Sequence, residues 1–154
     1  WGKITSKTAS GGRHCNIGKY HSSGAGNLGL FYFNYENSIP GWQLGVSKAD
    51  TNQVFVSISI DPTEGTYYYI QFGYNASVPN IFMSINDGTP ATAAYGSGTP
   101  VNDALNLVLG RAGDYDGMYL DGALDMVGFW NGRVLTTGEI TSLYNGGAGL
   151  DYPF

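Results

Sequence analysis

Residues 119–147, YLDGALDMVGFWNGRVLTTGEITSLYNGG, combine in one stretch the two patterns that decide the fold. The first half continues an apolar alternation that spans 118–130 and is typical of a β-strand. A polar, glycine-containing turn follows, and the second half has the spacing of a short helix. The stretch therefore predicts a strand, a turn and a helix in direct succession.

The predicted helix has signals at both ends. Thr136 precedes Glu139 by the three residues of a capping box, in which the hydroxyl and the carboxylate satisfy each other's unpaired backbone N–H groups. Gly146 supplies a left-handed stop. Apolar residues at helical spacing lie between these signals, namely Ile140, Leu143 and Tyr144. Two helical turns are only marginally stable alone, so we expect this apolar face to dock on the sheets.

The rest of the chain reads as strands without intervening helices. The predicted strands are 1–8, 14–20, 28–35, 41–48, 53–60, 67–74, 80–86, 105–112 and 118–130. Residues 21–27 are predicted as a loop, and 88–104 as a long irregular connection. Strands at this close spacing predict an antiparallel sandwich.

The composition agrees with a single all-β domain. Glycine accounts for 24 of the 154 residues and tyrosine for 12, whereas charged residues make up only 12 %. Glycine, aromatic and β-branched residues favour tight turns and strands. A hydrophobic content of 42 % argues against disorder. With no linker to divide it, 1–154 is interpreted as one domain.

The net charge and the hydropathy argue against two kinds of partner, nucleic acid and the membrane interior. The net charge of −5 and the scattered Lys and Arg residues argue against binding to nucleic acid. No run approaches the roughly 18 apolar residues that a membrane span needs, so membrane insertion is not expected. The chain opens on Trp1, and is expected to be a processed product or part of a longer protein. The single Cys15 excludes an internal disulfide.

The C-terminal half resembles a known family. The patterns G-x-L-D-x-V-x-F-W at 122–130 and L-T-x-x-E-I-x-x-L-Y at 135–144 are similar to the C-terminal signature of the laminin G-like, concanavalin A-like lectin-glucanase domains. The segment YYYIQFGYNASVPNIFMSINDG at 67–88 resembles a hairpin of that family. The resemblance covers 41–150 well and 1–40 loosely. The matching positions of the signature are Gly122, Leu124, Asp125, Val127, Trp130, Leu135, Thr136, Glu139, Ile140, Leu143 and Tyr144.

This resemblance implies an antiparallel two-sheet jelly-roll β-sandwich with one short C-terminal helix. Members of the family usually carry a first strand upstream of a tryptophan that matches Trp1. The sequence lacks this strand, so we expect an incomplete sheet edge. The resemblance also implies a location that is extracellular, on a cell surface or on a virion surface.

Asp125 is the candidate metal-binding residue. It shares the strand face of Val127 and Phe129, where a carboxylate needs a partner. In the family that the chain resembles, the matching acid often takes part in a structural Ca²⁺ site with main-chain carbonyls from the start of the chain. Such a set suits calcium, which takes six or more oxygens. Alternatively, the carboxylate accepts hydrogen bonds from a neighbouring loop, and both interpretations stay open.

Catalysis is not predicted. Glycosidases on such a sandwich need two facing carboxylates, which the spacing of Glu36, Glu64 and Glu139 does not provide. Nucleophile, phosphate-loop, dinucleotide and zinc patterns are also missing from the sequence. In RHCNIGKYH, neighbouring strand residues point to opposite faces, so His14 and Cys15 could not easily share a metal. The chain is interpreted as a non-enzyme.

The candidate ligand-binding residues gather in the loop GRAGDYDGMY. Asp114, Tyr115 and Asp116 place an aromatic ring between two acids, with Arg111 just before them. Sugar-binding sites combine an aromatic face for the ring C–H groups with polar groups for the hydroxyls. The same residues are also typical of a tight turn. Trp42, in PGWQLG, is a further candidate platform.

The sequence supports two hypotheses about the function. The leading hypothesis is a lectin-like or adhesion module that recognises a glycan or another cell-surface ligand through loops at one rim of the sandwich. The second is a structural protein, such as a virion (phage) capsid decoration or fibre domain, which contacts copies of itself or a larger surface assembly. Low charge, glycine and tyrosine richness and an open sheet edge favour the second.

Overall fold

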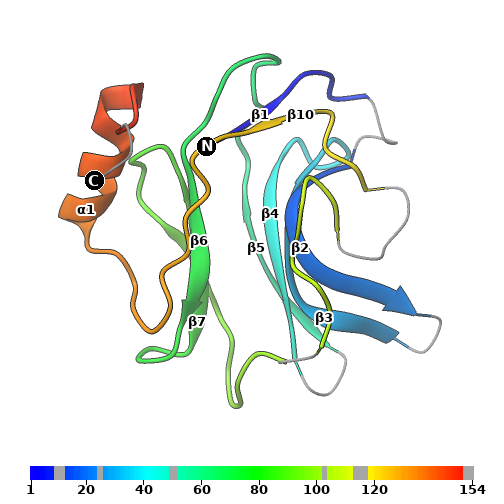
Figure 1. The fold of residues 1–154 in the computed structure, drawn as a ribbon. Helices are drawn as coiled ribbons and strands as arrows, with labels where there is room; N and C mark the ends of the chain where they lie inside the picture. The colour runs from blue at the N-terminus through cyan, green and yellow to red at the C-terminus, as the bar shows by residue number, and fades with distance from the viewer. Residues whose placement is uncertain (9–12, 24–25, 49–51, 102–103, 113–117, 151–154) are drawn as a thin grey trace.

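A computed structural model of the chain describes residues 1–8, 13–23, 26–48, 52–101, 104–112 and 118–150 (Figure 1). The elements are β1 (Gly2–Ile4), β2 (Arg13–Ser23), β3 (Gly26–Glu36), β4 (Gly41–Ser47), β5 (Gln53–Ile58), β6 (Ile70–Asn75), β7 (Asn80–Ile85), β8 (Ala91–Ala94), β9 (Val108–Leu109), β10 (Gly122–Leu124), α1 (Thr137–Tyr144) and the 3₁₀ turn η2 (Asn145–Gly147). The predicted all-β class with one short α-helix is confirmed. Within these ranges, no helix combines the length and the apolar character that crossing a membrane would require.

The described strands form three antiparallel sheets. One sheet has five strands in the order β5-β4-β3-β2-β9, a second has the order β6-β7-β8, and β1 pairs with β10. The five-stranded and three-stranded sheets face each other across a shared core, with β6 and β7 opposite β4 and β5 in Figure 1. The pairing of β1 with β10 brings the start of the chain beside its C-terminal third.

Stacked aromatic rings join the two larger sheets. The Phe33 ring lies between Phe72, at 4.8 Å between centroids, and Trp42, at 5.6 Å. Burial of a side chain as large as Phe33 contributes about 1.5–3 kcal/mol to stability. The alternation expected from residue 53 onward is also present, because Val56 is buried and Phe55 is exposed.

The predicted strand pair at 14–20 and 28–35 is longer than expected. β2 and β3 continue through most of 21–27, and Ser23 pairs with Gly26. The expected loop is therefore replaced over most of its length by paired strands. The polar composition of the segment predicted a loop, but strand pairing uses main-chain groups that polar residues also have.

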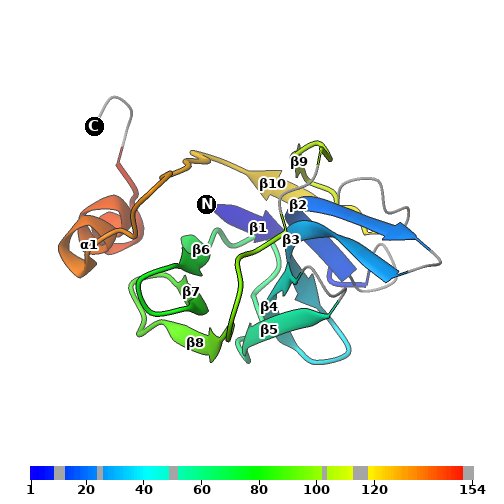
Figure 2. The same ribbon diagram turned by 90° about the horizontal axis from the view of Figure 1, so that it is seen from below.

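The predicted strand 118–130 is much shorter in the structure, and β10 ends at Leu124. Two residues later, Met126 takes a left-handed backbone with φ 47°, which cannot continue a strand. Residues 125–135 then run from β10 to α1 without joining a sheet, as Figure 2 shows. The apolar alternation is present in this segment, but it has no described strand as a partner.

Other strand boundaries also differ from the expectations. The strand expected at 105–112 is reduced to β9, and Gly110 follows it with φ 75°. The expected strand 1–8 is reduced to β1. Conversely, the irregular connection predicted at 88–104 contains β8, whose ATAA sequence pairs with β7 despite its low strand propensity.

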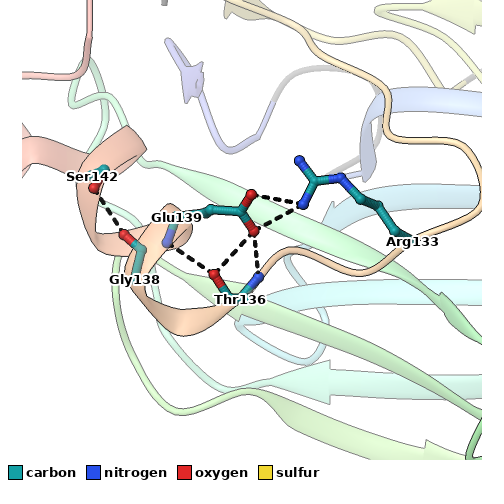
Figure 3. A network of polar contacts seen from close by, with 5 residues as sticks. All are labelled: Arg133, Thr136, Gly138, Glu139 and Ser142. Atoms are coloured by element: carbon teal, nitrogen blue, oxygen red, sulfur yellow. Dashed lines mark hydrogen bonds and ion pairs between the residues drawn. The ribbon is translucent and has the colours of Figure 1, made fainter.

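The capping box at the start of α1 is confirmed (Figure 3). The Glu139 N–H donates to Thr136 Oγ1 at 3.3 Å, and the Thr136 N–H donates to Glu139 Oε2 at 2.8 Å. Arg133 adds an ion pair to the same carboxylate at 2.7 Å. At the other end, the first left-handed residue is Asn145, with φ 47°, one position before the expected Gly146.

The expected docking of α1 on the sheets is only slight. No residue of α1 is buried, and Figures 1 and 2 show the helix beside the sheets, away from the core. Its described aromatic contacts are made by Tyr144, which stacks on Trp1 at 5.9 Å and lies 6.3 Å from Tyr69. The helix is instead held locally by its capping box and by Asn145 Nδ2, which donates to the Gly149 carbonyl at 2.7 Å.

Candidate functional site

Arg111 and Tyr119 form the stem of the loop at 112–118. They are antiparallel bridge partners, and the Leu120 N–H donates to the Gly110 carbonyl at 2.9 Å next to them. The Arg111 guanidinium lies 5.8 Å from the centroid of the Tyr119 ring, within cation–π distance. We call this pair the rim pair. Three of the sequence-predicted ligand residues, Asp114, Tyr115 and Asp116, lie outside the described residues.

The rim pair has two properties that a polar ligand can use. The Tyr119 side chain is 42 % exposed and presents a ring at the surface. The Arg111 Nε atom is buried without a hydrogen-bond partner in the described structure. An exposed aromatic ring beside a cationic donor is the combination expected at a sugar-binding site. Sequence reasoning identified Arg111 but not Tyr119, which reads simply as part of a strand.

Trp42 does not present a surface platform. Its exposed fraction is 0 %, and its ring stacks on Phe33 and packs edge-on against Tyr35. The cause is the alternation of side chains along β4, which places Trp42 on the same buried face as Leu44 and Val46. Tyr95, another aromatic residue of the sequence, is likewise buried, and its hydroxyl donates to the Ser47 carbonyl at 2.8 Å.

Asp125 lies at the exposed end of β10. Its N–H donates to the Trp1 carbonyl at 3.0 Å, and its own carbonyl accepts from the Trp1 nitrogen at 2.9 Å. These main-chain bonds extend the pairing of β1 with β10. None of the hydrogen bonds formed between described residues involves its carboxylate.

Asp125 is not part of a cluster of metal-binding side chains among the described residues. These residues contain no cluster of three or more His, Cys, Asp or Glu side chains that could hold a metal ion. Main-chain carbonyls and waters would have to supply the other ligands of the six or more oxygens that calcium takes. Calcium binding therefore stays a prediction from the resemblance. Thermal unfolding with added calcium and with EDTA checks it, because a bound structural ion raises the melting temperature that the chelator lowers.

His14 and Cys15 belong to different parts of the core. His14 is buried near Tyr35, and its ring nitrogens contact the Lys7 carbonyl at 3.1 Å and the Asp121 N–H at 3.3 Å. Cys15 packs instead in a small second cluster with Ala112 and Met118 among others. Burial raises the pKa of the Cys15 thiol to about 12, which leaves it protonated and a poor metal ligand.

A groove of about 660 Å³ opens between the two larger sheets. Its floor is the inner face of the five-stranded sheet, with the buried Phe33 and Leu44 among the lining residues. β6 forms one wall, and 124–135 forms the other. Apolar side chains of that second wall, among them Phe129, are exposed, and no described strand pairs with the segment. We call this feature the inter-sheet groove.

Asn16 lies at one end of the inter-sheet groove, close to Gly2. It is the extra residue of a β-bulge in β2, because Cys15 pairs with Asn34 and Ile17 pairs with the adjacent Phe33. A bulge changes the side to which the following residues point, so Asn16 and Ile17 both face the groove. Sequence reasoning missed Asn16, because a bulge depends on the register of two strands.

The rim pair and the inter-sheet groove are the two candidate sites on the described residues. Sequence reasoning pointed to the first through Arg111, and gave no indication of the second. Among the described residues, neither site contains a carboxylate side chain. Compared with known proteins, the chain matches no family model, no curated protein and no solved structure.

Proposed function

We propose that this protein is a non-catalytic recognition module that binds carbohydrate through the rim loop at 111–119. The observation that carries the proposal is the rim pair, in which the exposed Tyr119 ring lies beside the Arg111 guanidinium. Aromatic rings contact the C–H face of a sugar, and guanidinium N–H groups donate to its hydroxyls. The acids of the same loop, at 114 and 116, add acceptors for further hydroxyls.

We extend the proposal to the arrangement of the sheets, which we interpret as a jelly-roll sandwich. A five-stranded and a three-stranded antiparallel sheet that share one core, together with the capping box at Thr136 and Glu139, support a laminin G-like jelly-roll sandwich. Rim loops of such a sandwich are held at fixed positions by the sheets, which suits recognition. An extracellular, cell-surface or virion-surface location belongs to the same proposal.

The partners of the three glutamates support a non-catalytic role. Glu36 pairs with Arg13 at 2.6 Å, and Glu64 Oε1 accepts from the Lys7 N–H at 2.7 Å. The Glu139 carboxylate accepts a hydrogen bond from the Thr136 N–H in the capping box. A general acid or a nucleophile of a glycosidase must instead face a second carboxylate across a cleft. Each glutamate therefore has a structural partner.

Glycan-array binding followed by affinity measurement tests the proposal. We expect wild-type protein to bind at least one glycan and Tyr119→Ala to weaken that binding by about tenfold, as the loss of a stacking ring implies. Tyr67→Ala is the matched control, because Tyr67 is 40 % exposed and also carries a cation–π contact, with Lys3 at 4.8 Å. No array signal, or equal losses in the two variants, would contradict the proposal.

A structural role in a surface assembly is the second candidate. The specific observation in its favour is the exposed apolar segment after β10, in which Phe129 is 62 % exposed and Val127 is 41 % exposed. Exposed apolar side chains on an unpaired segment invite contact with another chain. Sedimentation separates the candidates, since an assembly subunit forms a defined oligomer and a recognition module stays monomeric.

A further inference from the structure

We infer that the inter-sheet groove is a second binding site, distinct from the rim pair, for a neutral and largely apolar molecule that ends in a hydroxyl group. The groove volume of about 660 Å³ lies within the range of small-molecule sites, roughly 300–1,000 Å³. The site is built between the sheets, and none of its described lining residues belongs to the rim loop at 111–119.

The described lining favours an uncharged ligand. Its charged groups are the Arg133 guanidinium and the α-ammonium of Trp1. The guanidinium is already bound to the Glu139 carboxylate, with N–O distances of 2.7 and 2.9 Å, and the ammonium donates to the Asp125 carbonyl at 2.9 Å. An ion in the groove would lose its hydration and compete with these contacts, whereas an apolar body would cover the rings and aliphatic groups of the walls.

The amide of Asn16 indicates which polar group the ligand carries at its end. Asn16 is 2 % exposed, and neither its Nδ2 nor its Oδ1 has a hydrogen-bond partner. Buried polar groups in proteins are almost always satisfied, so two unsatisfied atoms on one side chain point to a missing partner. A hydroxyl donates to Oδ1 and accepts from Nδ2, and so satisfies both atoms. An ether accepts only, and leaves Oδ1 unpaired.

The binding assay uses N-phenyl-1-naphthylamine, a neutral apolar fluorophore, and its displacement by two isomers. 1-Decanol has the hydroxyl, and 1-methoxynonane has the same atoms with an ether oxygen. We expect saturable binding of the fluorophore, and displacement by the alcohol at an about tenfold lower concentration than by the ether, since an unsatisfied buried acceptor weakens binding. A signal that does not saturate, or equal displacement by the isomers, overturns the inference.

Two pairs of variants locate the site. Val127→Glu puts a charge on the groove wall at a position that is 41 % exposed, and we expect it to weaken fluorophore binding about tenfold. Val78→Glu, at a position that is 59 % exposed and outside the groove, should leave binding unchanged. Asn16→Leu should remove the preference for the alcohol over the ether. Equal effects of the two glutamate variants overturn the inference.

The same measurements distinguish other occupants of the groove. If a second copy of the chain fills it, the fluorophore does not bind and sedimentation shows a dimer, which overturns the inference. Should Asn16→Leu fail to fold, the Val127 and Val78 variants still decide the location, and the two isomers decide the polar contact. Loss of glycan binding in Tyr119→Ala without any change in fluorophore binding would separate this site from the proposed rim function.

Discussion

Among single residues, Asn16 combines near-complete burial with an amide that has no hydrogen-bond partner. Without a ligand, this amide costs stability, because its atoms have lost water and gained nothing in return. Asn16→Leu is nearly isosteric and should raise the free energy of unfolding by about 1–2 kcal/mol. Urea unfolding followed by tryptophan fluorescence measures the change.

Asn34→Leu is the matched control for this prediction. Asn34 is as buried as Asn16, but only its Oδ1 lacks a hydrogen-bond partner, because its Nδ2 donates to the Tyr35 carbonyl at 3.4 Å. The control variant loses this bond, so we expect no gain in stability. A decrease in stability for Asn16→Leu would show that water or a protein group already satisfies the amide. The pair therefore tests whether the bulge is kept for binding at the expense of stability.

Cys15 offers a second test at this scale. The thiol is fully buried, and its pKa is raised to about 12 chiefly by that burial. Since the thiolate is the reactive form, we expect no reaction with DTNB in native buffer at mildly alkaline pH, and complete reaction once the chain is unfolded in guanidinium chloride. Rapid labelling of the native protein would contradict the described burial of this residue.

At the scale of elements, α1 is held by its ends more than by its packing. It contributes no buried residue, and its N-terminal N–H groups depend on the capping box (Figure 3). Thr136→Ala removes one half of the box and should destabilise the helix by about 1 kcal/mol. Amide hydrogen exchange within α1 should accelerate by about fivefold, which corresponds to that energy.

The expected effect of Thr136→Ala is local. The sheets share no buried residue with α1, so their amides should exchange as in the wild type. Thr141→Ala makes the same change at an exposed position inside the helix, where alanine has the higher propensity, and should not accelerate exchange. Faster exchange throughout the sheets of Thr136→Ala would mean that the helix stabilises the whole domain.

The elements also show what could be predicted from the sequence. The hairpin of β6 and β7 and the capping box depend on neighbouring residues, and both are present as expected. The ends of β10 and the existence of β8 depend on distant partners. Leu124 is the last residue of β10 that finds a partner, on β1, and the low strand propensity of Ala91–Ala94 is outweighed by β7.

The candidate site was less predictable than the fold. Arg111 was identified from its neighbours in the loop, whereas the partnership with Tyr119 comes from a bridge across that loop. Trp42 was chosen because it is aromatic, but its position on the inward face of β4 places the ring in the core. The place of Asn16 in the groove could not be predicted, because it depends on the register of two strands. Residue type thus indicated possible chemistry, and tertiary pairing decided which residues reach a ligand.

At the scale of the whole molecule, several thiol and phenol groups stay protonated at pH values above their ordinary pKa. Burial and a hydrogen bond to Asp61 raise the pKa of Tyr35 to about 12, and burial raises the pKa of Cys15 to the same region. Burial also raises the pKa of Tyr32 and of Tyr69. In the unfolded chain these groups would lose their protons near pH 8.5 for cysteine and near pH 10 for tyrosine, roughly.

These shifts predict a loss of stability in alkaline solution. Above about pH 8.5 the unfolded chain releases protons that the native protein keeps, so the native state binds more protons. The free energy of unfolding then falls as the pH rises, and continues to fall until the native groups themselves titrate near pH 12. Below the ordinary pKa values, the contribution of these groups to stability is constant.

Thermal unfolding from about pH 8 to pH 12, followed by circular dichroism and by tyrosinate absorbance, measures this dependence. We expect the melting temperature to decrease steadily, with part of the tyrosinate signal appearing only as the protein unfolds. Cys15→Ala removes the group with the lowest ordinary pKa, so its melting temperature should fall less between about pH 8.5 and pH 10 than that of the wild type. The cavity left by the substitution lowers the melting temperature at neutral pH as well, so the comparison uses the change with pH. A constant melting temperature over the whole range would contradict the burial of these groups, because their protons could then leave without unfolding.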